Sequence, residues 1–270
     1  NFVGNRIGVQ GMVKTIQMAL EDQMTIPEED ALFGSVMGRP KTAMFKTADL
    51  VGLDTLAHVA KNTYDLVVDD DARDSFFKHE IVTTMIEKKL LGKKSQGGFY
   101  KTDLTPDWKR IRKVIDPATL DYAEFEFASF PCLEKAKEAK SLPEKIKTVV
   151  YGDDRGARFA WKAIANNLIY AANRIPEISD TIVEIDTAMN WGFNFEMGPF
   201  ETWDAIGLAK SAARMEKEGL ALPAKVKKML AAGNSSFYKT ANGKLFYYDF
   251  AQETYIERAV NANIVSLASL

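Results

Sequence analysis

Side chains that could carry acid–base or nucleophilic chemistry are few in this sequence. Its 270 residues contain two histidines, His58 and His79, and one cysteine, Cys132. A single cysteine excludes an internal disulfide and a multi-cysteine metal site, and two histidines argue against a histidine-built zinc site, so no metal site is expected. Each histidine lies in a stretch with helical periodicity. We therefore interpret both as structural or solvent-facing side chains rather than general bases.

Motifs for nucleotide binding or hydrolysis are absent. Gly4, Gly8 and Gly11 do not have the G-x-G-x-x-G spacing, and no strand rich in valine or isoleucine precedes them. The sequence also lacks a Walker A pattern, a serine nucleophile elbow and an H-E-x-x-H motif. We expect this chain not to bind a dinucleotide by the Rossmann mechanism on its own.

Asn5 is the polar residue with the most specific candidate role. An amide can donate a hydrogen bond to a substrate oxygen and can orient a general base, without titrating near neutral pH. Asparagine is also favoured at helix N-caps, and Asn5 lies where the first helical run begins. The residues alone favour the N-cap interpretation, although one side chain could fill both roles.

Helical periodicity dominates the elements that must position these residues. Helices are predicted across residues 48–64, 74–91, 159–173 and 179–191, and a short charged helix across 107–114. A strand signal is found where aromatic residues flank Asn242 and Gly243, which predicts a hairpin. The predicted fold class is therefore all-α.

The two halves of the chain resemble each other. Residues 49–53 (DLVGL) match 204–208 (DAIGL), residues 2–7 correspond to 159–164, and residues 98–101 (GFYK) match 236–239 (SFYK). We interpret residues 1–103 as one helical module, 104–155 as a connector and 156–270 as a second, diverged copy. Apolar faces of the two modules would bury each other in an intramolecular pseudo-dimer. The alternative is two unrelated helical domains that share these short matches by chance.

Composition and charge exclude several broad classes of protein. The chain is 46% hydrophobic and 27% charged with a net charge of −2, which is ordinary for a globular protein and gives no sign of nucleic-acid binding. No apolar run approaches the roughly 20 residues that span a bilayer, so we expect no membrane partner. Cysteine usage favours a reducing, cytoplasmic setting. The chain opens on Asn1 shortly before a helical run, and we expect it to be part of a larger protein.

Five motifs in order resemble the C-terminal domain of the 3-hydroxyacyl-CoA dehydrogenase family. They are residues 2–6 (FVGNR), 49–54 (DLVGLD), 94–100 (KSQGGFY), 185–189 (IDTAM) and 197–201 (MGPFE). The resemblance covers nearly the whole chain and is weakest across 104–155. It implies two tandem modules with the fold of the 6-phosphogluconate dehydrogenase C-terminal domain. Tandem modules of this kind are similar to those of multifunctional β-oxidation proteins.

The family resemblance implies an NAD-dependent (3S)-3-hydroxyacyl-CoA dehydrogenase of fatty-acid β-oxidation that acts on acyl-CoA. In that family an upstream Rossmann domain binds NAD and supplies the His–Glu pair, and an enoyl-CoA hydratase domain can be fused. The helical domain contributes one catalytic asparagine, and the matching position is Asn5. With the resemblance, the catalytic interpretation of Asn5 becomes the favoured one. The second module has Lys162 at that position, so only the first is expected to reach the chemistry.

Two other functions remain compatible with the sequence. The chain could be a non-catalytic helical interaction module of the same ancestry. It could also be the helical domain of a dehydrogenase that acts on a hydroxy acid rather than a thioester. For the 3-hydroxyacyl-CoA dehydrogenase interpretation, we expect the 270 residues alone to be inactive, because the NAD-binding motif is absent.

Overall fold

The computed structural model describes residues 2–76 and 80–259, and these residues are mainly helical. The predicted all-α fold class is confirmed, with two small three-stranded antiparallel sheets in addition. The first half contains α1 (Gln10–Glu21), α2 (Ile26–Leu32), α3 (Phe45–Val51), α4 (Leu53–Leu66), α5 (Glu80–Glu87), β1 (Tyr100–Leu104), β2 (Arg110–Ile115) and β3 (Tyr122–Glu124). Helices α6 (Pro131–Ala136) and α7 (Leu142–Val150) follow.

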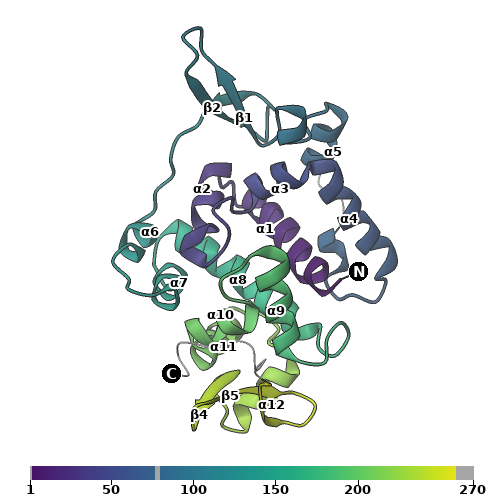
Figure 1. Cartoon of the computed structure of the whole chain (residues 1–270), viewed down its shortest axis with the longest axis vertical. Coiled ribbons are helices and arrows are strands. Elements are labelled where there is room, and N and C mark those ends of the chain that lie inside the picture. Colours follow the sequence, from purple (N-terminus) through teal and green to yellow (C-terminus); the bar gives the residue numbers. More distant parts are fainter. Residues whose placement is uncertain (1, 77–79, 260–270) are drawn as a thin grey trace.

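The second half repeats this order of elements. It contains α8 (Arg155–Asn173), α9 (Ile182–Phe193), α10 (Pro199–Ile206), α11 (Leu208–Lys217), α12 (Ala224–Ala231), β4 (Tyr238–Ala241), β5 (Lys244–Asp249) and β6 (Thr254–Glu257). The two sheets lie at opposite ends of the long axis, with α1 and α8 in the middle of the molecule (Figure 1). The long helices of the two halves therefore form the central layer.

Local sequence signals explain where several helices begin. The Thr25 hydroxyl accepts a hydrogen bond from the Glu28 N–H, and the Glu28 carboxylate accepts one from the Thr25 N–H, which is a complete capping box. Ser141 caps α7 by accepting a hydrogen bond from the Glu144 N–H. Both starts follow the same local pattern, a hydroxyl residue three positions before a glutamate.

The segment after residue 103 differs from the sequence prediction. The short helix predicted over 107–114 is wrong, because Arg110–Ile115 is the central strand of the first sheet. It pairs with β1 and β3, so its backbone N–H and C=O groups bond to neighbouring strands, which the local charge pattern does not reveal. The hairpin at Asn242 and Gly243 is confirmed, with both residues in the left-handed region that a tight two-residue turn requires.

An aspartate near the end of a helix accepts two backbone hydrogen bonds at the same place in each module. Asp49 accepts hydrogen bonds from the N–H groups of Phe99 and Tyr100, both at 2.8 Å. Asp204 accepts the same two bonds, also at 2.8 Å, from Phe237 and Tyr238. Each carboxylate thus ties the end of a helix to the aromatic segment that begins a sheet.

A second aspartate in each module accepts a hydrogen bond from a tyrosine hydroxyl. Tyr100 donates to Asp30 and Tyr238 donates to Asp186, each at 2.8 Å. Asp30 and Asp186 also accept backbone N–H groups at the start of α3 and of α10. The two halves therefore share one hydrogen-bond scaffold, residue for residue.

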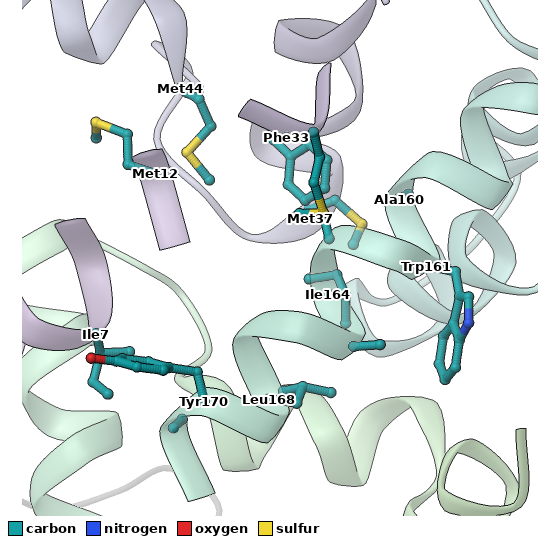
Figure 2. Close-up of a cluster of buried hydrophobic side chains, with 14 of the residues drawn as sticks. Ile7, Met12, Phe33, Met37, Met44, Ala160, Trp161, Ile164, Leu168 and Tyr170 are labelled. Atoms are coloured by element: carbon teal, nitrogen blue, oxygen red, sulfur yellow. The ribbon is translucent and has the colours of Figure 1, made fainter. Parts of the chain in front are cut away.

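Large apolar side chains fill the contact between the halves. Figure 2 shows Phe33 and Met37 of the first half beside Ala160 and Ile164 of α8. The rings of Phe33 and Phe159 meet edge to face with centroids 6.0 Å apart. Burial of each such side chain stabilises the fold by about 1.5–3 kcal/mol, so this contact holds the halves as one body.

We predict that Asp49→Asn and Asp204→Asn destabilise the protein by similar amounts, about 1–3 kcal/mol each. An amide offers one oxygen to two N–H donors, and its NH₂ group faces the second donor. Chemical denaturation measures the free energy of unfolding. Asp54→Asn is the control, because Asp54 is more exposed and pairs with Lys94 at the surface. Unequal losses at Asp49 and Asp204 would contradict a shared scaffold.

Candidate functional site

Asn5 lies inside helical backbone rather than at its start. Val3 and Gly4 are already helical, and residues Asn5–Val9 form a π-helical turn that continues into α1. The N-cap interpretation is therefore wrong. The Asn5 side chain is half-buried and makes no hydrogen bond to another described residue. Its amide is free to bind a ligand, and π-helical turns are frequent at functional sites.

Arg6, the next residue, fixes this turn against both halves. Its Nη2 lies 2.6 Å from the Asp70 carboxylate and 2.7 Å from the Glu177 carboxylate. The Tyr170 hydroxyl donates to Asp70 at 2.7 Å, and Arg174 pairs with Asp70 at 3.1 Å. Asp70 follows α4, whereas Tyr170 and Glu177 belong to the second half. The network therefore joins the two halves directly beside Asn5.

The Asp70 carboxylate of this network is charged at neutral pH, and the Tyr170 hydroxyl is neutral. Burial alone would raise the pKa of Asp70, but hydrogen bonds from Tyr170 and the Ala72 N–H and the charges of Arg174 and Arg6 lower it. Burial raises the pKa of the Tyr170 hydroxyl, and so does its hydrogen bond to Asp70. Tyr170 therefore acts as a neutral donor. Arg6 pairs with none of Asp49, Asp54 and Asp204, whose carboxylates have other partners.

The glycines of the first helical turns lie against the second half. A Cβ at Gly8 would lie 2.2 Å from Cζ of Phe193, and one at Gly11 would lie 2.8 Å from Nδ2 of Asn167. Gly4 also faces Phe193. These glycines, whose spacing excluded a dinucleotide motif, allow close helix packing. In the sequence, the signal for this close packing is a glycine every three or four residues on one helix face.

The position that matches Asn5 in the second half has a different role. The Lys162 ammonium lies 2.9 Å from both carboxylate oxygens of Asp22, at the end of α1. Lys162 therefore bridges the two halves at their surface. Its side chain is occupied by an ion pair, whereas the Asn5 amide is not.

Other candidate residues lie apart from Asn5. His58 is exposed on α4 and bonds to Asn62, and His79 lies outside the described residues. Cys132 is buried, and burial together with Asp154 raises the pKa of its thiol to about 12, so it is not a reactive thiolate. No group of three potential metal ligands occurs among the described residues.

An apolar groove of about 400 Å³ runs along α1, α4 and α5. Val13, Ile16, Leu56 and Phe76 form much of its floor, and Lys61 lies at its edge. Val13 is eight positions after Asn5, roughly 12 Å along the same helix.

The described part of the chain contains no helix long and apolar enough to cross a membrane.

Comparison with known proteins relates this chain to one family. The chain matches the family model for the C-terminal domain of 3-hydroxyacyl-CoA dehydrogenase over residues 2–102 and 159–247. It is 45% identical over 249 residues to a probable 3-hydroxyacyl-CoA dehydrogenase of Bacillus subtilis (strain 168), covering 92% of this chain and 31% of that protein.

More distant relatives extend this comparison. A putative fatty acid oxidation complex trifunctional enzyme of Rickettsia felis is 28% identical over 203 residues, covering 74% of this chain and 26% of that protein. The crystal structure of 3-hydroxybutyryl-CoA dehydrogenase from Escherichia coli K12 has a TM-score of 0.54 at 16% identity, covering 86% of this chain and 60% of that one. At this identity the match shows the fold alone. The chain spans about a third or less of these two curated relatives.

We predict that Gly8→Ala destabilises the protein by about 1–3 kcal/mol, because its Cβ would displace the Phe193 ring. In a Phe193→Ala background the same change stabilises by about 1 kcal/mol, since alanine favours a helix. A double-mutant cycle of unfolding free energies measures this reversal. Gly192→Ala is the control, because no atom lies within 4 Å of its Cβ. The same sign in both backgrounds would contradict the packing role of Gly8.

Proposed function

Because the chain belongs to the 3-hydroxyacyl-CoA dehydrogenase family and contains its C-terminal domain, we propose that it is the helical part of an NAD-dependent (3S)-3-hydroxyacyl-CoA dehydrogenase of fatty-acid β-oxidation. The whole enzyme would oxidise the C3 hydroxyl of an acyl-CoA to a ketone. This chain would supply a hydrogen-bonding amide, part of the acyl-CoA cleft and the contact between its own two modules.

The observation that supports this proposal best is the free amide of Asn5 on a firmly held helix. The side chain bonds to no other described residue, yet the neighbouring Arg6 is buried in a network that joins both halves. A substrate oxygen or a general base requires a hydrogen-bond donor that is held in place and is not already bonded within the protein. Asn5 would donate its N–H to the substrate oxygen at C3 and keep the base in register.

NAD does not fit the residues of this chain. Both sheets of the described residues are antiparallel, and the sequence has no G-x-G-x-x-G motif. We therefore place the NAD site and the general base in an upstream Rossmann domain of the whole protein. We also place the acyl chain in the groove lined by Val13, Ile16, Leu56 and Phe76, whose surface is mainly apolar.

A multifunctional parent protein is part of this proposal. The Rickettsia relative bears the name of a fatty acid oxidation complex trifunctional enzyme, and the chain covers 26% of it. We propose that a hydratase domain can accompany the dehydrogenase in the whole protein. Residues 1–103 and 156–270 would be duplicated modules, a division favoured by the matching Asp–Tyr contacts in the two halves.

In the full-length protein we expect Asn5→Ala to lower kcat/KM for a 3-hydroxyacyl-CoA by about a hundredfold to a thousandfold, because a hydrogen-bond donor at the reacting oxygen is lost. Steady-state kinetics measures this loss, and thermal unfolding checks that the variant is folded. Lys162→Ala is the matched control and should leave kcat/KM unchanged. Unchanged kinetics in Asn5→Ala would instead favour a non-catalytic helical module.

The 270-residue chain alone should transfer no hydride from a 3-hydroxyacyl-CoA to NAD, since it lacks the motif that would bind the dinucleotide. The absorbance of reduced nicotinamide measures the reaction. Turnover by this chain alone, above that of a heat-denatured sample, would contradict the proposal that the NAD site lies elsewhere.

A further inference from the structure

A small internal cavity lies where the first helix meets the second half. Its volume is about 40 Å³, and residues from both halves line it. The wall is mainly apolar, and several of its side chains, Ile7, Met12, Phe33, Met44 and Ile164, are visible in Figure 2. The cavity is separate from the groove along α4 and α5, and Asn5 does not line it.

Arg39 is the one charged residue that lines this cavity. The residue is 6% exposed, and its Nε and Nη1 are buried without a hydrogen-bond partner among the described residues. The guanidinium stacks on the Phe195 ring at 3.6 Å, which satisfies none of its N–H groups. Burial lowers the pKa of Arg39 to about 9, so the group stays charged at pH 7.

A buried guanidinium without a counter-charge is costly, because arginines inside proteins are almost always paired. No carboxylate lines the cavity. By contrast, the buried Arg6 and Arg174 are each paired with acids. The side chain of Asn167 lines the same cavity, is 8% exposed and has an Oδ1 without a partner.

We propose that this cavity binds a small monocarboxylate of the size of formate or acetate, held by the Arg39 guanidinium at the contact between the two halves. A carboxylate matches the planar N–H fork of arginine and supplies the missing negative charge. The Asn167 amide offers a second polar contact, with its oxygen and nitrogen able to exchange places.

The dimensions of the cavity select the ligand. About 10–15 Å³ of such space holds one water molecule, so 40 Å³ admits a few waters or one small carboxylate but not a long acyl chain. The methyl group of acetate would lie against apolar side chains such as Met12 and Met189. Because the lining comes from both halves, the bound anion would tighten the contact that holds the helix of Asn5.

The test is a thermal unfolding titration of the 270-residue chain with sodium acetate. Ionic strength is kept constant with sodium gluconate, whose carboxylate is attached to a chain too large for the cavity. We expect a saturable rise in Tm of about 5 °C at a hundredfold excess over Kd. Arg39→Met should lose this rise, and Arg110→Met, a change at an exposed arginine, should keep it. No rise, or an equal rise in Arg39→Met, would overturn the proposal.

A second measurement needs no variant. Met12, Met44 and Met189 line the cavity, whereas Met18 and Met229 are buried elsewhere. With ¹³C-methyl methionine, acetate should shift the resonances of the first three and leave the other two unchanged. Absence of these shifts at saturating acetate would mean that the cavity holds only water and would overturn the proposal. Shifts spread evenly over all five methyl groups would overturn it as well.

Discussion

The close approach of the first helix to the second half is the constraint on which the rest of the structure depends. Gly4 and Gly8 allow the Phe193 ring to lie against the helix backbone, where a side chain would collide with it. The π-helical turn that contains Asn5 continues into this helix, which also carries Val13 and Ile16 in the groove. Its placement therefore determines where a polar donor and an apolar surface stand relative to each other. Packing, rather than capping, orients this candidate site.

The contact between the two halves contains one buried arginine that is paired with acids and another that is not. Arg6 is surrounded by Asp70, Tyr170 and Glu177, so its burial is balanced by ion pairs that also join the halves. Arg39 is buried at the same contact. Among the described residues, the Phe195 ring stacks on its guanidinium, but no carboxylate pairs with it. The two arginines therefore differ in charge compensation rather than in location. An interior charge needs a counter-charge or a bound ion to offset its lost hydration.

The two halves keep one scaffold and differ where function would require it. Asp49 and Asp204 bind the same backbone groups, and Tyr100 and Tyr238 bind equivalent aspartates. Burial raises the pKa of Asp49 and of Asp204 to about 6 in the same way. At the position of the free Asn5 amide, however, the second half has Lys162 in an ion pair with Asp22. A structural role for the second half agrees with this divergence.

The sequence by itself determined the helical class, the caps at Thr25 and Ser141, the hairpin at Asn242 and the family resemblance. These depend on neighbouring residues, whose propensities and spacing are local. Only the tertiary structure decided that Asn5 is not a cap, that the partner of Arg6 is Asp70, and that Arg110–Ile115 is a strand. Arg6 and Asp70 are 64 positions apart, and Arg6 and Glu177 are 171 apart. Burial brings such residues together, and no local pattern encodes which distant side chains will share an interior.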